Sequence, residues 1–519
     1  MYRIPQLLNR AAQQRPGHAA TRMNDRVRSW AEVHDRVRRL AAAIRAAGAG
    51  TGDRVALLAL NGDRYFETLF AIAWAGSVAV PVNTRLAAPE VEYILADCGP
   101  VLLFLDAAFQ PMLPDLPAAA GMKALVCLDD GPVPAGQVAF EDLVAGHAPM
   151  AEAGAGDGDL AGIFYTGGTT GRSKGVMLTH DNLVTNAFNA VEGMRFDRHT
   201  NHLHAAPMFH LADGMCTYAV TAVGGTHSFI PRFTPQAALA AIERHRVTHS
   251  AMVPTMLNMI GQAPDAGSYD LSSLQQINFG ASPMQEAVFR RLQALVPHAR
   301  LLHGYGMTET APLLTMLPPE YNTVDGPLAG RLASCGQACM GVELRIVDPD
   351  GREVPRGTIG EIAARGPNVM LGYWNKPEET AKVLREGWMH TGDGAWMDDE
   401  GFVFIVDRLK DMIISGGENV YSAEVESVIS LMPGVGEVAV FGIPSAEWGE
   451  AVHATVVPRA DASLTPEAVI AHCRASIAGY KCPRSVEIRQ AALPLSGAGK
   501  VLKTVLRKPY WQDRGSSVA

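Results

Sequence analysis

Apolar helical patterns alternate with short β-branched runs through about the first four hundred residues, and this alternation constrains the fold more than any other feature. The run 54–60 predicts a strand, and the helical pattern 65–74 follows it. The run 78–82 predicts the next strand, and 90–97 predicts the next helix. Such alternation is typical of α/β layers with largely parallel strands. Because open α/β sheets bind ligands beyond the carboxyl ends of their strands, we expect functional residues in those loops.

The length and the composition limit the class of protein. A chain of 519 residues is too long for one ordinary core, so we expect two or more domains. Its 48% hydrophobic and 19% charged residues are typical of a soluble globular protein. The net charge is 44 − 53 = −9, which argues against a general affinity for nucleic acid. We leave open a local basic stripe near Lys500, Lys503, Arg507 and Lys508.

The sequence shows no targeting or membrane signal. The N-terminus lacks the apolar core of a secretory signal, and no window approaches the ~18 apolar residues that span a bilayer. The cysteines form no zinc-binding pattern, and their odd number predicts reduced thiols in a cytoplasmic protein, none of them catalytic. They are Cys98, Cys127, Cys216, Cys335, Cys339, Cys473 and Cys482.

The most informative motif follows the apolar run 160–165 and reads Thr166-Gly-Gly-Thr-Thr-Gly-Arg-Ser-Lys174-Gly175. Glycines let main-chain N–H groups converge on an anion, threonine hydroxyls add donors, and Lys174 adds a positive charge for phosphate. The P-loop of nucleotide hydrolases needs Gly-Lys-Ser/Thr, which this segment lacks. The same composition also fits a flexible turn, so the motif alone leaves both interpretations open.

Together with motifs further along the chain, this segment resembles the phosphate loop of the adenylate-forming superfamily, which contains acyl-CoA synthetases, peptide-synthetase adenylation domains and luciferases. The similarity covers roughly residues 160–510 and is greatest to bacterial fatty-acyl-CoA synthetases. Gly168 and Ser173 stand where the family usually has Ser and often has Pro, and His303 stands where Gln or Glu is commoner. The resemblance implies that the ATP phosphates are bound by Thr166, Gly167, Gly168, Thr169, Thr170, Gly171 and Lys174.

The companion motifs occur in the order that the family has. The segment 207–211 is similar to the border of the acyl pocket, and 280–283 is similar to the turn that lines adenine. The segments 303–310 and 388–393 are similar to the motifs that hold the nucleotide. The resemblance assigns catalytic roles to Lys500, Glu309, Thr308 and His210. It assigns nucleotide or coenzyme A contacts to Gly280, Ala281, Ser282, His303, Gly304, Tyr305, Gly306, Asp393, Arg408, Gly416 and Gly417.

Individual roles follow from the same resemblance. Tyr305 is implied to stack on adenine, and Thr308 to meet the α-phosphate. Glu309 is implied to hold Mg²⁺, since a hard divalent cation prefers carboxylate and phosphate oxygens. Asp393 is implied to accept the ribose hydroxyls, and Arg408 to contact ribose or phosphate.

The resemblance also implies an α/β fold with two parts. A large multi-layered N-terminal domain with α/β subdomains spans 1–406, and a small mobile α+β domain spans 407–519. Asp407 is the implied hinge, and Lys500 is the implied catalytic lysine. Gly416-Gly417 is implied to lie beside the pantetheine tunnel once the small domain rotates.

The implied reaction has two steps. The substrate carboxylate attacks the α-phosphorus of ATP and forms an acyl-adenylate and pyrophosphate, and the thiol of coenzyme A then attacks the adenylate and releases AMP. ATP, Mg²⁺ and coenzyme A are therefore the expected cofactor and co-substrates of an AMP-forming acyl-CoA synthetase. Nucleic acid is not an expected partner, and a homodimer is the family-level expectation.

The acid is less well defined by the sequence. We expect a medium- or long-chain fatty acid or another apolar acid, because Met208, Met215 and Met307 suggest an adaptable apolar wall. Gly214 and Gly280 are expected to leave space for it. An aryl-CoA ligase and an adenylation enzyme that loads a carrier protein are the alternatives.

Within the superfamily, the main alternative is an amino-acid adenylation domain, and an inactive relative is a further alternative from a different class. An amino-acid adenylation domain would have Asp directly after Phe209, where this chain has His210, although Asp213 nearby keeps that alternative open. An inactive nucleotide-binding relative is disfavoured because the motif residues Thr169, Glu309, Asp393, Arg408 and Lys500 are all present.

Overall fold

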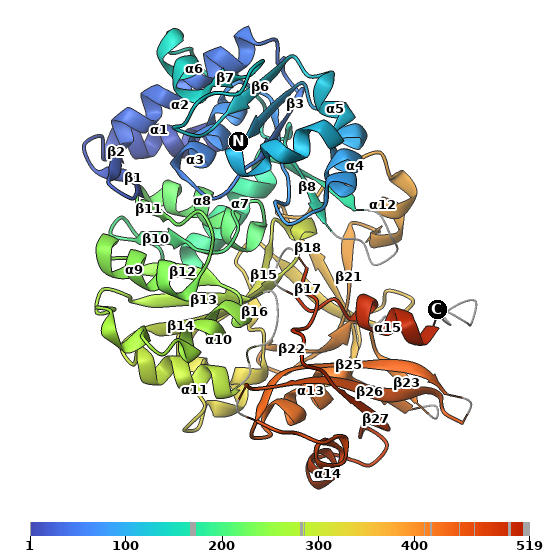
Figure 1. Ribbon diagram of the computed structural model, residues 1–519. Helices are drawn as coiled ribbons and strands as arrows, with labels where there is room; N and C mark the ends of the chain where they lie inside the picture. The colour runs from blue at the N-terminus through green and yellow to red at the C-terminus, as the bar shows by residue number, and fades with distance from the viewer. Residues whose placement is uncertain are drawn as a thin grey trace.

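The computed structural model describes residues 2–166, 173–280, 284, 286–408, 411–415, 418–445, 447–460, 462–496 and 500–511. Within these ranges the strands form a nine-stranded sheet, an eight-stranded sheet and two five-stranded sheets, which confirms the predicted α/β class. Figure 1 shows the last five-stranded sheet and its helices as an orange-to-red unit beside the green nine-stranded sheet. Among the helices of these ranges, none is both long and apolar enough to cross a membrane.

The eight-stranded sheet contains the predicted phosphate segment. Six of its strands, from β8 to β7 in sheet order, run parallel, and β9 and β19 add antiparallel at one edge. The order is β19 (Gly372–Tyr373), β9 (Lys174–Thr179), β8 (Leu160–Thr166), β4 (Val78–Pro81), β3 (Arg54–Leu58), β5 (Leu102–Leu105), β6 (Ala124–Cys127) and β7 (Val138–Ala139). The strands predicted at 54–60 and 78–82 are confirmed as β3 and β4.

The nine-stranded sheet positions the predicted adenine and acyl segments. Its central strands are parallel, and the edge strands β2, β15 and β16 pair antiparallel. The order is β16 (Gln337–Ala338), β15 (Leu313–Leu317), β14 (Arg300–Gly306), β13 (Gln276–Gly280), β12 (His249–Met252), β10 (Asn201–His204), β11 (Thr226–Phe229), β1 (Ala19–Met23) and β2 (Arg26–Ser29).

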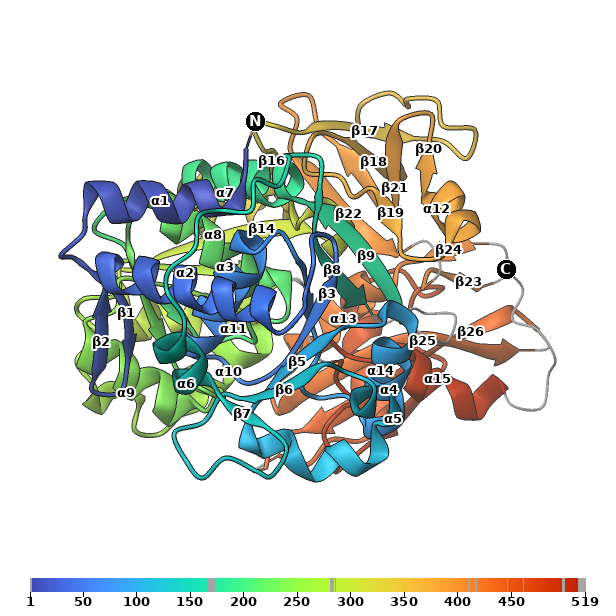
Figure 2. The same cartoon turned by 90° about the horizontal axis from the view of Figure 1, so that it is seen from above.

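Helices cover both large sheets, as Figure 2 shows from above. They are α1 (Ile4–Gln14), α2 (Trp30–Ala46), α3 (Asp63–Trp74), α4 (Ala88–Cys98), α5 (Pro117–Ala120), α6 (Phe140–Gly146), α7 (His180–Gly193), α8 (Leu211–Val223), α9 (Pro235–His245), α10 (Pro254–Gln262) and α11 (Glu286–Leu295). The helices predicted at 65–74 and 90–97 are confirmed as α3 and α4. Local chemistry explains where α2 begins, because Ser29 accepts a hydrogen bond from the Glu32 N–H while the Glu32 carboxylate accepts one from Ser29.

One continuous core joins the two large sheets. It contains Leu57 of β3 and Phe164 of β8 from one sheet, Phe229 of β11 from the other sheet, and Phe70 of the helix α3. Burying each such side chain contributes about 1.5–3 kcal/mol. The loops at the ends of these strands therefore stand on a rigid base.

The two smaller sheets follow in the chain. The first contains β17 (Glu343–Val347), β18 (Gly360–Arg365), β20 (Leu384–Arg385), β21 (Trp388–Met397) and β22 (Val403–Arg408), with α12 (Pro377–Val383) beside it. The second contains β23 (Ile413–Ser415), β24 (Glu418–Val420), β25 (Val435–Ser445), β26 (Gly449–Pro458) and β27 (Ser485–Ile488). Its helices are α13 (Ser422–Ser430), α14 (Pro466–Ser476) and α15 (Lys503–Trp511).

Two of the four cations in the basic stripe that the C-terminal sequence left open have ion-pair partners. Lys503 is ion-paired with Glu426 at 2.7 Å, and Arg507 is ion-paired with Glu450 at 2.5 Å. These two cations are therefore neutralised inside the C-terminal unit and do not form a surface for polyanions.

Candidate active site

The ends of the predicted phosphate loop meet at one edge of the eight-stranded sheet. Thr166 is the last residue of β8, Lys174 is the first of β9, and the two are paired in the antiparallel ladder. The loop residues between them that were assigned to phosphate binding are Gly167, Gly168, Thr169, Thr170 and Gly171, and they lie outside the described residues.

Lys174 lies in a chain of contacts that ends at the predicted metal ligand. Its Nζ is 2.6 Å from Oε2 of Glu379 and lies 5.0 Å from the ring centroid of Tyr373. The Tyr373 hydroxyl donates a hydrogen bond of 2.8 Å to Oε1 of Glu309, which is buried, and Thr308 precedes it at the start of a single 3₁₀ turn. Sequence reasoning missed Tyr373 and Glu379, because nothing in their local sequence indicates that they lie beside the phosphate segment.

Two residues predicted to bind the nucleoside come together across two sheets. The hydroxyl of Tyr305, on β14, donates a 2.7 Å hydrogen bond to Asp393, on β21. Burial, and then the Asp393 charge, raises the pKa of Tyr305, so the phenol remains a donor. The main chain of Arg408 pairs with Asp393 in the β21–β22 ladder, while the Arg408 side chain lies outside the described part of the chain.

Glycines let the main chain approach closely around this site. A Cβ on Gly306 would lie 1.7 Å from the Pro312 carbonyl oxygen, and a Cβ on Gly280 would lie 2.4 Å from that of Gly304. A Cβ on Gly214 would lie 2.6 Å from the Met208 carbonyl oxygen. The expectation that Gly214 and Gly280 leave space for the acid is therefore wrong, because main-chain atoms occupy that space. Ala281 and Ser282, next to Gly280, lie outside the described residues.

Packing explains why a histidine fits at position 303, where the family more commonly has Gln or Glu. Its ring stacks on Phe279, with centroids 4.9 Å apart and planes 3° apart, and its Nδ1 donates to the Ser334 carbonyl at 3.3 Å. Burial lowers the pKa of His303 to about 4, so the imidazole is neutral near pH 7. His303 thus packs against the strand that carries Gly280.

His210 is fixed at the start of α8. Its Nδ1 accepts a hydrogen bond from the Ala212 N–H at 3.1 Å and so caps the helix. Burial, and then the charges of Lys500 and Arg85, lowers the pKa of His210 to about 4. The ring is therefore neutral, with Nδ1 as an acceptor, and it lies within electrostatic reach of Lys500.

The C-terminal segment holds Lys500 within electrostatic range of His210. The Lys500 N–H donates to Oγ of Ser496 at 3.1 Å, and the Ser496 N–H donates to the Lys500 carbonyl at 2.7 Å. A long contact of 3.5 Å joins Arg85 of the N-terminal part to the Ser496 carbonyl. The structure therefore holds the C-terminal segment against the predicted acyl region.

Asp213 does not offer a free carboxylate to a substrate ammonium. One oxygen is 3.1 Å from Nε2 of His202, and the other is 2.6 Å from Nδ1 of His204. His204 in turn contacts His227 at 3.0 Å, and all four side chains are buried. Burial opposes ionisation of Asp213, but the two histidines outweigh it and hold its pKa below the usual value.

The predicted methionine wall is part of the protein core. Met208 and Met215 are buried in the cluster that joins the two large sheets, and Met307 packs against the same cluster while partly exposed. Of the three, Met307 alone has surface that a substrate can contact, and it precedes Thr308 and Glu309.

The implied hinge residue is tied to the C-terminal unit. Asp407, on β22, accepts hydrogen bonds from the N–H and the hydroxyl of Ser422 at 2.6 and 2.7 Å. The ammonium of Lys503 contacts the same hydroxyl. The glycine pair Gly416-Gly417 lies outside the described residues.

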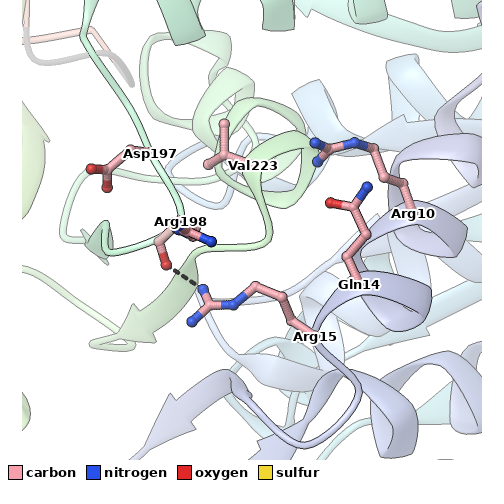
Figure 3. A pocket seen from close by; sticks show the side chains of 6 residues that line it. All are labelled: Arg10, Gln14, Arg15, Asp197, Arg198 and Val223. Carbon is pink, nitrogen blue, oxygen red and sulfur yellow. Dashed lines mark hydrogen bonds between the residues drawn. The ribbon is translucent and has the colours of Figure 1, made fainter.

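Two hollows lie on the surface of the large part. One, shown in Figure 3, is lined by Arg10, Gln14, Arg15, Asp197, Arg198 and Val223, and contains none of the predicted site residues. There the Arg15 guanidinium donates a hydrogen bond of 2.7 Å to the Gly224 carbonyl, just after α8 ends. Arg15 therefore has a structural role at the end of this helix. The other hollow lies beside Phe209 and Pro207 and is lined by Arg85 and Arg232. Burial and the neighbouring Arg232 lower the pKa of Arg85.

Comparisons with known proteins agree with this geometry. The model of the AMP-binding enzyme family matches residues 8–374, and that of the AMP-binding enzyme C-terminal domain matches residues 424–500. A feruloyl-CoA synthase from Amycolatopsis is 40% identical over 96% of this chain and 98% of its own. The long-chain-fatty-acid–CoA ligase FadD13 of Mycobacterium tuberculosis is 36% identical over 93% of each chain.

A solved structure is also similar over its whole length. ATP-bound MatB from Rhodopseudomonas palustris superposes with a TM-score of 0.88 at 34% identity, covering 99% of this chain and 100% of its own. The chain therefore belongs to the AMP-binding enzyme family, the adenylate-forming class that the motifs implied. Within this class it is an AMP-forming CoA ligase for an acyl or aryl acid, with ATP and coenzyme A as co-substrates.

Proposed function

We propose that this ligase activates an apolar carboxylic acid, with an aromatic acid of the arylpropenoic kind as the preferred class. The supporting observations for the chemistry are that Lys500 lies within electrostatic range of His210, that Tyr305 bonds Asp393, and that the buried Glu309 lies in the turn that follows the strand of Tyr305. The support for an aromatic acid is the 40% identity to a feruloyl-CoA synthase.

In the proposed first step, the acid carboxylate lies beside His210 and attacks the α-phosphorus of ATP. Two anions must approach each other, so the ammonium of Lys500 lowers the barrier by stabilising the negative charge as it develops. Thr308 donates its hydroxyl to the α-phosphate, and Lys174 neutralises the phosphates that leave. The imidazole of His210 is neutral and adds no net charge beside the acid. Because its Nδ1 accepts the Ala212 N–H, its proton lies on Nε2, which is a hydrogen-bond donor.

The nucleoside is held by the pair across the two sheets. The Tyr305 ring stacks on adenine, and Asp393 accepts the ribose hydroxyls beside the Arg408 main chain. Glu309 is suited to Mg²⁺, because its buried carboxylate has one oxygen oriented by the Tyr373 hydroxyl. When bound, Mg²⁺ supplies positive charge to the phosphates.

In the proposed second step, the part 407–519 turns about Asp407 relative to 1–406, withdraws Lys500 and presents the Gly416-Gly417 segment to coenzyme A. The first five-stranded sheet ends with β22 at Arg408, and the second begins with β23 at Ile413, which supports this boundary. The seven cysteines are all free and buried, which supports our proposal of a cytoplasmic enzyme with no cysteine in catalysis. A homodimer stays a prediction.

A fatty acid is the second candidate, supported by the 36% identity to FadD13. The deciding experiment is pyrophosphate release with ATP, Mg²⁺ and a panel of ferulic, coumaric, benzoic, octanoic and palmitic acids, each with and without coenzyme A. We expect the largest kcat/KM for an arylpropenoic acid and a thioester product. Turnover of palmitic acid above all aryl acids would reverse the order of the candidates, and no turnover of any acid would contradict the proposed class of substrate.

A further inference from the structure

Glu379 is shared by two lysines that differ in where they lie. Oε2 of Glu379 is 2.6 Å from Nζ of Lys174, the last cation of the phosphate segment, and Oε1 contacts Nζ of Lys382, one turn further along α12. The Lys174 side chain is 19% exposed, whereas that of Lys382 is 67% exposed. One carboxylate therefore joins an inner lysine of the candidate active site to an outer lysine on the surface.

Because Glu379 contacts both lysines, it keeps Lys382 as an ion-pair partner when its contact with Lys174 breaks. Hydrogen bonds from Lys174 and then from Lys382 lower the pKa of Glu379 to about 2, so it is a full negative charge at neutral pH. A polyphosphate that takes Lys174 leaves this charge paired with Lys382, so no unpaired ion remains. The reverse also holds, because Lys174 is neutralised by Glu379 when no phosphate is present.

The ammonium of Lys174 also lies over the ring of Tyr373. Its Nζ lies 5.0 Å from the ring centroid of Tyr373, within the range of a cation–π contact, and the hydroxyl of that ring bonds Glu309. Lys174 can thus turn from Glu379 towards the candidate nucleotide site while it remains over the ring. The lysine and its two partners come from β9, β19 and α12, and are brought together by the β9–β19 pairing.

From this arrangement, and resting on the proposed function, we infer that Glu379 is an exchangeable counter-ion of Lys174 that competes with the phosphates of ATP. It is a positioning residue, since it acts on the nucleotide through Lys174. Partly exposed ion pairs are weak, so the competition amounts to about a two- to fivefold change in ATP affinity.

The test measures Kd for Mg²⁺-ATP and for adenosine by titration calorimetry in the full-length enzyme without acid. Glu379→Gln keeps the size of the side chain and removes its charge, so ATP should bind about two- to fivefold more tightly, while adenosine, which has no phosphates, should bind unchanged. Lys382→Ala removes the outer partner, so Glu379 should hold Lys174 more firmly and ATP should bind more weakly by a similar factor. Glu467→Gln, an exposed acid in the first turn of α14, is the matched control and should leave both Kd values as they are.

The double variant separates competition from general damage. If Lys382 acts through Glu379, Glu379→Gln with Lys382→Ala should match Glu379→Gln alone. Unchanged or weaker ATP binding in Glu379→Gln overturns the inference, as does an equal change in adenosine binding. A wild-type enzyme that binds no ATP would instead contradict the proposed function itself, so the two failures are distinguishable.

Discussion

The hydroxyl of Tyr305 donates a 2.7 Å hydrogen bond to Asp393. This bond joins the nine-stranded sheet to the five-stranded sheet that contains β21, at the place where the nucleoside is proposed to bind. The two residues are 88 positions apart in the chain. Their contact makes the adenine and ribose functions one unit, and it supports a first prediction.

Asp393→Ala should raise the KM for ATP about 10- to 100-fold, because hydrogen bonds to a charged group are worth about 1.5–3 kcal/mol. Tyr305→Phe keeps the ring and removes only the hydroxyl, so its effect should be smaller, about two- to tenfold. The measurement is the ATP dependence of pyrophosphate release at saturating acid. An effect of Tyr305→Phe as large as that of Asp393→Ala would show that the hydroxyl does more than orient the carboxylate.

Lys500→Ala should reduce acid-dependent pyrophosphate release at least 100-fold, because it removes the positive charge that acts on His210 and is proposed to stabilise the reacting anions. Thioester formation from supplied acyl-AMP and coenzyme A should stay near the wild-type rate. The exposed Lys508 offers a control, and Lys508→Ala should leave both steps intact. Normal adenylation in Lys500→Ala would remove this residue from the first step.

Tyr373→Phe should raise the Mg²⁺ concentration for half-maximal adenylation about tenfold or more, since the residue that orients a metal ligand is lost. The ring under Lys174 is kept. Because adenosine has no phosphates and needs no Mg²⁺, its Kd should not change. Tyr480→Phe, at a partly exposed position in the C-terminal unit, is the matched control. An unchanged Mg²⁺ dependence would argue against Glu309 as the metal ligand or against its orientation by Tyr373.

Acid should destabilise the protein through its buried histidines. Burial lowers the pKa of His210 and His303 to about 4 and that of His249 to about 3, from an ordinary value near 6.5. Below pH 6.5 the unfolded chain therefore binds protons that the folded chain does not, and the free energy of unfolding falls as the pH drops from about 6.5 to 4.

Each such histidine adds about 1.4 kcal/mol per pH unit to that slope. Urea midpoints measured between pH 7 and 4.5 report it. His303→Gln should make the slope shallower by one proton whatever its effect on stability at pH 7, while the exposed His199→Gln should leave the slope alone. An identical slope in His303→Gln would show that its imidazole is already charged in the folded protein.

Much of the fold followed from local patterns. The strands at 54–58 and 78–81 and the helices α3 and α4 lie where apolar periodicity predicted them, within a few residues. These features depend on short stretches of chain, and short stretches carry enough information to specify them.

Contacts between segments far apart in the chain could not be predicted from local sequence patterns. Asp213 looked available to a substrate, yet His202 and His204 occupy it from a neighbouring strand. Gly214 looked like empty space, yet the Met208 carbonyl fills it. In each case the deciding partner comes from another element, and its approach depends on how the elements pack.

The sequence by itself determined the class of enzyme, because the motifs that resemble those of the adenylate-forming superfamily are contiguous runs that can be recognised locally. Only the tertiary structure decided how those runs cooperate. It brought Lys500 within electrostatic range of His210, Tyr305 against Asp393, and Glu379 between Lys174 and Lys382. The physical reason is that charge pairing and hydrogen bonding act over a few ångströms in space, whereas the residues concerned are brought within that range by sheet pairing and core packing.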